Sequence, residues 1–171
     1  SRVSWVDEVR IERRFPDTIY VELKERQPLA LYQKNQRLLL VDRNGDVITD
    51  YGLKRFQDLL IITGEGAPQN AKELIDVLGI EKEVASHVAA ASYGGRRRWN
   101  LKTKSGISVK LPAEDIGLAL RRLAMMQEEK EILGKDLQHI DLREPDRIIV
   151  QAVPGKVQEY SIQHFKAGYS S

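Results

Sequence analysis

The feature that most constrains the fold of this chain is an alternation of apolar and polar side chains that recurs in short runs. Near the beginning, Val9 and Ile11 alternate with charged residues, and the same pattern returns from Ile19 to Leu23 after a Phe-Pro-Asp-Thr segment at 15–18. A period of two on both sides of a turn signal is typical of a β-hairpin with one face in water. Because two strands alone are only marginally stable, we expect this hairpin to pack against the rest of the chain or against residues that precede it.

Further strands are predicted where short apolar runs are bounded by turn residues. Asn44-Gly45 between two such runs is a strong hairpin signal, and Gly106 and Pro145 occupy two later turns. The predicted strands cover residues 29–32, 38–41, 47–48, 59–62, 99–101, 107–111 and 148–153.

Helical spacing predicts three helices between these strands. The first begins with Asn70 as its cap and ends before Gly79, the second covers 81–92, and the third runs from Ile116 to Gly134 with Arg121 and Arg122 on its polar face. The connections are too short for several parallel crossovers, so we expect an α+β fold with a largely antiparallel sheet and flanking helices.

Composition excludes several classes of protein. The 171 residues include 27 Lys plus Arg against 25 Asp plus Glu, and a net charge of +2 argues against binding a polyanion over a wide surface. With no cysteine, the chain has neither disulfides nor thiolate chemistry. No apolar run is long enough to span a membrane. The chain also lacks an initiator methionine, and we interpret it as a fragment from which an anchor was removed.

No motif predicts an enzyme, a metal site or a cofactor. The three histidines, at 87, 139 and 164, have no metal-ligand spacing, and there is no Gly-x-Ser-x-Gly nucleophile motif. The Gly64-Glu-Gly66 segment resembles the start of a dinucleotide-binding loop, but Gln69 replaces the third glycine and Pro68 removes a backbone donor. Carboxylates near Asp141 and Asp146 leave a hydrolase as a formal alternative, although we interpret them as a solvated turn.

The densest positive charge is Arg96-Arg97-Arg98, followed directly by Trp99. Arginines next to an aromatic residue bind single-stranded nucleic acid in some proteins, so a nucleic-acid-binding module is the main alternative function. Trp99 also alternates with Leu101, which indicates a core position, and arginine is favoured at protein interfaces.

Several motifs resemble the FtsQ/DivIB family of bacterial cell-division proteins. The most specific are Glu25-Arg26-x-Pro28 and Asp42-x-x-Gly45, and the Arg98-Trp99 pair and Ile140-Asp141-Leu142-Arg143 agree as well. The resemblance implies three parts: the last two strands of a POTRA domain at 1–28, a β domain at 29–153 and a C-terminal tail at 154–171.

The resemblance also implies a function. Members of the family are non-enzymatic divisome scaffolds that bind the bitopic proteins FtsB and FtsL and help to assemble the septal cell-wall synthesis machinery. They are anchored by one helix in the inner membrane, with this portion on the periplasmic side at the division septum. No cofactor or metal is implied.

Residue by residue, the resemblance assigns partner binding to the last strand, the turn before it and one arginine ahead of the Arg-Trp strand. From the sequence pattern alone, the last strand is an interior strand or an edge strand, and the resemblance favours an edge that pairs with a partner strand. A segment of the tail, 159–162, is a candidate to compete for this edge. The assigned residues are Arg96, Arg143, Glu144, Ile148, Ile149, Val150, Gln151 and Ala152.

Overall fold

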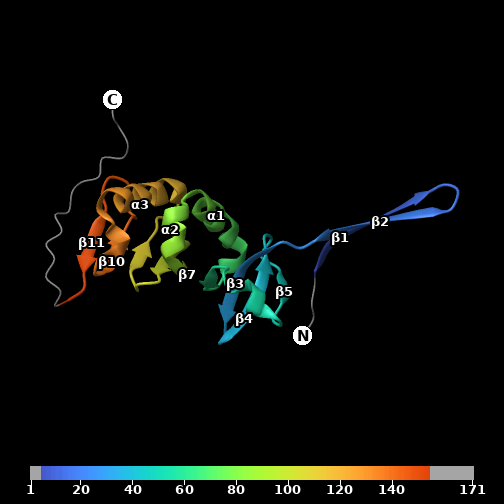
Figure 1. The fold of residues 1–171 in the computed structure, drawn as a ribbon, viewed down its shortest axis with the longest axis horizontal. Coiled ribbons are helices and arrows are strands. Elements are labelled where there is room, and N and C mark those ends of the chain that lie inside the picture. The colour runs from blue at the N-terminus through green and yellow to red at the C-terminus, as the bar shows by residue number, and fades with distance from the viewer. Residues whose placement is uncertain (1–4, 155–171) are drawn as a thin grey trace, which may run out of the picture.

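The structure is a computed structural model that describes residues 5–154. Its first part is a hairpin of β1 (Val6–Arg14) and β2 (Thr18–Glu25), which pair antiparallel with Ile11 opposite Val21. The predicted hairpin is therefore confirmed. No other described residue covers its apolar face, where five side chains are 54–70% exposed: Val9, Ile11, Ile19, Val21 and Leu23. Figure 1 shows the hairpin projecting away from the rest of the molecule.

The remaining strands form one sheet of nine, in the order β11-β10-β9-β8-β7-β6-β3-β4-β5. One part of it is built from β3 (Pro28–Lys34), β4 (Arg37–Asp42), β5 (Val47–Thr49) and β6 (Ile61–Thr63). The other part is built from β7 (Val88–Gly94), β8 (Arg98–Thr103), β9 (Ser108–Lys110), β10 (Leu137–Asp141) and β11 (Ile149–Ala152). The three predicted hairpins in this sheet, with turns at Asn44-Gly45, Gly106 and Pro145, are confirmed.

The sheet is mainly antiparallel, as expected, but it contains more parallel pairs than we predicted. Five neighbouring pairs are antiparallel and three, β3/β6, β6/β7 and β9/β10, are parallel. The prediction that the connections are too short for several crossovers is wrong. The two helices at 67–80 and 82–87 return the chain from β6 to β7, and the helix at 116–130 returns it from β9 to β10. The connection from β3 to β6 instead runs through β4, β5 and a short 3-10 helix.

The helices that make the β6–β7 and β9–β10 crossovers cover one face of the sheet (Figure 1). They are α1 (Ala67–Ile80), α2 (Lys82–His87) and α3 (Ile116–Lys130), and the main core lies between them and the sheet. A smaller cluster of Leu31, Leu40 and Ile48 packs with Trp5 and Phe56. Because Ala30 and Val41 belong to the main core while their neighbours Leu31 and Leu40 do not, the small cluster lies on the opposite face. Two short 3-10 helices, Leu53–Phe56 and Ile132–Gly134, complete the described structure.

Two helix predictions need correction. The first helix begins at Ala67 rather than after Asn70, because Gly66 adopts a left-handed conformation (φ 82°) and Pro68 lies in the first turn. Asn70 does not cap the helix. Its side chain donates to the carbonyl oxygen of Gly66 at 2.8 Å. Residues 81–92 are not one helix. α2 ends at His87, and the chain continues as β7, which hydrogen-bonds between β6 and β8 in the middle of the sheet.

Packing explains the glycine at position 64. Its φ is 103°, and a Cβ atom there would lie 2.0 Å from the carbonyl oxygen of Tyr93. The predicted tail, except for Pro154, lies outside the described residues, as does its segment 159–162. None of the described helices is long and apolar enough to cross a membrane.

Candidate functional site

The last described strand, β11, lies at one edge of the nine-stranded sheet. It pairs antiparallel with β10, with Val150 opposite Ile140 and Ile149 opposite Asp141, and within residues 5–154 no strand pairs with its other side. Figure 1 shows β11 at the end of the molecule farthest from the hairpin. The sequence pattern left an interior strand open, and the position of β11 now makes it an edge within the described part of the chain.

Two residues of β11 direct their backbone N–H and C=O groups away from β10. The N–H of Val153 donates to the carbonyl oxygen of Asp136 at 3.2 Å, so alternate residues back along the strand, Gln151 and Ile149, also face β10. The N–H and C=O groups of Val150 and Ala152 therefore point to the open edge. These groups are the donors and acceptors that an added strand would use.

The side chains of β11 and the preceding residue alternate between the core and solvent. Ile148 is buried, and Val150 packs against the main core. Ile149 is 41% exposed and Gln151 is exposed, so these two present the outer face of the strand. Of the residues assigned to partner binding, Ile148 thus has its side chain in the core, and Val150 directs its partly buried side chain to the same face.

The turn before β11 carries the next two assigned residues, Arg143 and Glu144, both exposed. The guanidinium of Arg143 donates twice to the carboxylate of Asp141, from Nε to Oδ1 at 2.9 Å and from Nη2 to Oδ2 at 2.7 Å. Hydrogen bonding to Asp141 raises the pKa of Arg143. Burial alone would raise the pKa of Asp141, but the bonds from Arg143 lower it overall. The pair therefore stays charged and holds the arginine at the end of β10.

Arg96 lies in the β7–β8 turn, at the same end of the sheet as this turn. Asn100, Lys110, Asp141 and Ile149 are successive partners across β8, β9, β10 and β11. The β7–β8 turn directly precedes β8, and the β10–β11 turn directly precedes β11, so both turns project beyond this row on one side. The topology thus brings Arg96, Arg143 and Glu144 to one end of the sheet, although they are separated by two strands.

The alternative of nucleic-acid binding finds no support. Trp99 is only 4% exposed, and its ring packs 4.9 Å, centroid to centroid, from the ring of Tyr93. A base cannot stack on a side chain that is enclosed in the core, so the aromatic half of that motif is not available. Among the described residues, no group of three or more histidine, aspartate or glutamate side chains is arranged to hold a metal ion.

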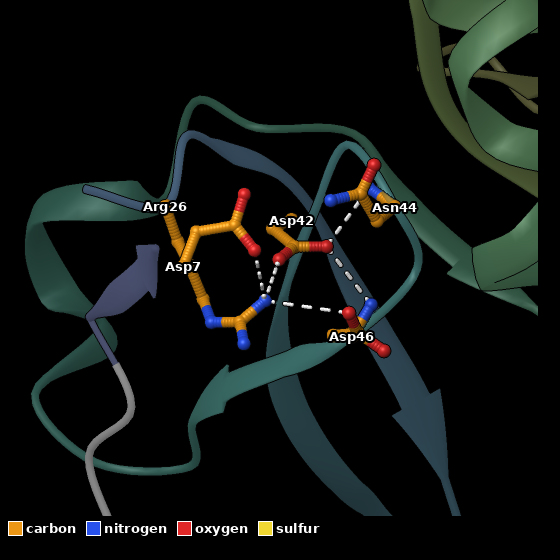
Figure 2. Close-up of polar contacts among 5 residues, drawn as sticks. All are labelled: Asp7, Arg26, Asp42, Asn44 and Asp46. Atoms are coloured by element: carbon orange, nitrogen blue, oxygen red, sulfur yellow. Dashed lines mark hydrogen bonds and ion pairs between the residues drawn. The ribbon is translucent and has the colours of Figure 1, made fainter. Parts of the chain in front are cut away.

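A polar cluster at the base of the hairpin was not predicted from the sequence (Figure 2). Arg26, between β2 and β3, donates from Nη1 to Oδ2 of Asp42 at 2.6 Å, and the same nitrogen lies 3.5 Å from Asp7 and 3.3 Å from Asp46. The other oxygen of Asp42 accepts from the backbone N–H groups of Asn44 and Asp46, both at 2.9 Å. The cluster joins β1 and the end of β2 to the β4–β5 turn.

This cluster belongs to the two motifs that carry the family resemblance. Arg26 is in the Glu-Arg-x-Pro element, and Asp42 begins the Asp-x-x-Gly element. Hydrogen bonding to Asp42 raises the pKa of Arg26. Burial raises the pKa of Asp42, but the contacts with Arg26 and the two backbone N–H groups outweigh it and lower the pKa overall.

Comparison with known families agrees with these motifs. The family described as "Cell division protein FtsQ/DivIB, C-terminal" matches residues 30–143, and the family "POTRA domain, FtsQ-type" matches residues 1–26. The chain belongs to the FtsQ/DivIB family. Its fold is POTRA-type strands followed by a mainly antiparallel sheet with three helices.

Similar proteins include several that are called cell division protein FtsQ. The relative from Bradyrhizobium diazoefficiens is 34% identical over 147 residues, which cover 86% of this chain and 43% of that protein. The relative from Rhizobium meliloti is 34% identical and covers 95% and 52%, and the one from Rhizobium radiobacter is 33% identical and covers 92% and 75%. The chain thus spans about half the length of the first two of these relatives.

A solved structure is also similar to this chain. It is the major extracytoplasmic domain of the trans isomer of the cell division protein DivIB from Geobacillus stearothermophilus. It covers 64% of this chain and 92% of its own, with 16% identity and a TM-score of 0.42.

Proposed function

We propose that this chain is the scaffold portion of a divisome protein that binds FtsB- and FtsL-type bitopic partners by adding a partner strand to β11. It acts without catalysis, on the periplasmic side of the inner membrane at the division septum, and a single membrane-spanning segment outside this chain anchors it. Arg143 and Glu144 in the preceding turn, and Arg96 at the same end of the sheet, contact the partner beyond the strand itself. The residues 1–28 and 29–153 serve as the POTRA and β domains.

The observation that carries this proposal is the open edge of β11. Val150 and Ala152 direct unpaired backbone groups outward among the described residues, and β-augmentation supplies affinity through such groups. The partly exposed side chain of Ile149 gives the added strand an apolar contact on the outer face. Family membership supports the cell-division role but does not by itself identify the partner.

The test removes one outward donor. Ala152→Pro deletes the N–H of a residue with a small side chain, and proline is tolerated on an edge strand where its nitrogen faces solvent. Ala152→Ser is the matched control, because it changes the side chain and keeps the N–H. Circular dichroism shows whether each variant is folded, and calorimetry measures its affinity for the extracytoplasmic segment of an FtsB-type protein.

We expect Ala152→Pro to weaken this affinity at least about tenfold, because the added strand loses one backbone hydrogen bond and the adjacent hydrogen bond is distorted. Ala152→Ser should bind like the wild type. A folded Ala152→Pro variant that binds with unchanged affinity would show that the partner does not use this edge.

A further inference from the structure

A buried arginine lies directly beneath the turn that leads into β11. Arg122 is on α3, and only 3% of the residue is exposed. The sequence pattern placed it on the polar face of the helix, and that prediction is wrong. Within residues 5–154 no carboxylate forms an ion pair with it, although the charge of Asp146 acts on it at longer range. A buried cation without a close counter-ion is unusual in a protein of this size.

The guanidinium of Arg122 is bound by backbone carbonyls of the β10–β11 turn. Its Nη2 donates to the carbonyl oxygen of Glu144 at 3.1 Å and to that of Arg147 at 2.6 Å. These two residues stand near the two ends of the exposed part of the turn, between Arg143 and Ile148. One nitrogen therefore holds the backbone of the turn on both sides of Pro145, a residue that has no backbone N–H of its own.

Fold stability alone does not explain this arrangement. Burial lowers the pKa of Arg122, because the charged form is partly removed from water, and its buried Nε atom finds no hydrogen-bond partner among residues 5–154. An apolar side chain of similar length would avoid both penalties, and replacing buried ionic groups with apolar ones is often neutral or stabilising. An apolar side chain would not supply the two hydrogen bonds that Nη2 donates to the turn.

We propose that Arg122 is a positioning residue that holds the 143–148 turn and thereby presents Arg143, Glu144 and the open edge of β11 in the conformation that receives a partner strand. The effect of Arg122 on partner binding rests on the proposed function. The ordering of the turn by Arg122 holds for the free protein.

Preorganisation is the physical reason for the effect on binding. An interface that is already ordered avoids the entropic cost of ordering backbone and side chains during association. Without the two donors, the carbonyl oxygens of Glu144 and Arg147 turn to water, and the turn samples several conformations. The first residue of β11, Ile149, then loses its fixed position opposite Asp141.

The test compares Arg122→Met with Arg121→Met. Methionine matches the length of the arginine stem and fills the same space, so the fold should be kept. Arg121 is the adjacent helix residue and its side chain is 58% exposed; it contacts Glu81, away from the turn. Hydrogen–deuterium exchange of the free proteins follows the amides of Arg147, Ile149 and Gln151, with the central-strand amide of Leu101 as an internal reference.

We expect Arg122→Met to exchange at least about tenfold faster at these three amides, with Leu101 and the melting temperature nearly unchanged. Its affinity for the FtsB-type segment should fall about tenfold. Arg121→Met should leave the turn and the affinity unchanged. If Arg122→Met does not fold, Arg122→Lys serves instead, because it keeps the charge but loses the planar fork; its turn amides should also exchange faster than in the wild type.

Unchanged exchange at the turn in a folded variant would overturn the inference. So would an equal acceleration at Leu101, because that would indicate a general loss of stability rather than a local role. If the wild type does not bind the segment at all, the proposed partner is wrong, while the exchange data still decide whether Arg122 orders the edge.

Discussion

Replacing Asp42 with asparagine tests whether the polar cluster at the base of the hairpin is a true structural link. Asp42 is only 2% exposed, and its carboxylate accepts three hydrogen bonds, one from Arg26 and two from the backbone N–H groups of Asn44 and Asp46. Asparagine keeps one oxygen for the two backbone donors and turns an amide NH2 toward the guanidinium. The substitution therefore removes one hydrogen bond between charged groups and leaves the β4–β5 turn intact.

The expected loss follows from that count. A hydrogen bond to a charged group is worth about 1.5–3 kcal/mol, so Asp42→Asn should lower the free energy of unfolding by about 2 kcal/mol. Asp42→Ala removes all three bonds and leaves two backbone donors without their acceptor, and should cost about 4 kcal/mol. Asp46→Asn is the matched control, because its carboxylate is largely exposed and such contacts are worth less than about 1 kcal/mol. Urea denaturation measures each value.

A double-mutant cycle decides whether the effect of Asp42 passes through Arg26. In an Arg26→Met background the guanidinium is absent, so Asp42→Asn should cost much less than it does in the wild type. If the substitution costs the same in both backgrounds, the carboxylate acts only within its own turn, and the hairpin is not held to the sheet by this pair.

Three further substitution sites, Asp42, Trp99 and Gly64, give testable outcomes. The pKa of Asp42 in the folded protein lies below its ordinary value of 3.8. Its contribution to the free energy of unfolding is therefore complete above that value and is lost as the pH falls through the lowered pKa. Urea denaturation at about pH 3 and pH 6 should show that the free energy of unfolding falls more on acidification for the wild type than for Asp42→Asn. Trp99→Ala should lower the free energy of unfolding by about 3–5 kcal/mol, measured by thermal and chemical denaturation, because the ring is buried against Tyr93; a smaller loss than about 1 kcal/mol would contradict the core assignment. Gly64→Ala should leave too little folded protein to measure, since its Cβ would collide with the backbone of Tyr93, whereas Gly79→Ala inside α1 meets no atom within 4 Å and should be stabilising by up to about 1 kcal/mol.

The hairpins could be predicted from the sequence because their signals are local. Apolar runs on both sides of Asn44-Gly45, and alternation on both sides of Gly106, fix strand, turn and strand within a few residues. The strand β7 could not be predicted in this way, because its Ala-Ala-Ala-Ser segment has no local preference for a strand and follows a short helix without a break. It becomes a strand through pairing with β6 and β8, which is a non-local effect that outweighs helix propensity.

The candidate site was predictable only in part for the same reason. The position of the last strand along the chain was visible, but its place at an edge depends on where eight other strands lie. Arg26 and Asp42 were both conspicuous in their motifs, yet their contact crosses 16 residues and no local pattern indicates it. For Arg122 a signal existed: on a helical wheel it borders Met126, at the margin of the apolar stripe, where a long side chain can turn inward.

The arrangement of these parts bears on how a scaffold of this kind would work. The hairpin is attached at the β4–β5 side of the sheet, and β11 forms the opposite edge (Figure 1). With neighbouring strands about 4.8 Å apart, the eight steps from β5 to β11 separate the two edges by roughly 40 Å. A hydrogen-bonded sheet packed on one face by three helices is stiff across this distance. The orientation of the hairpin relative to a partner strand on β11 therefore depends on two small sets of contacts, Arg26 with its carboxylates at one edge and Arg122 with its turn at the other. Loosening either set should change how the hairpin and a strand added to β11 are held relative to each other, without unfolding the sheet between them.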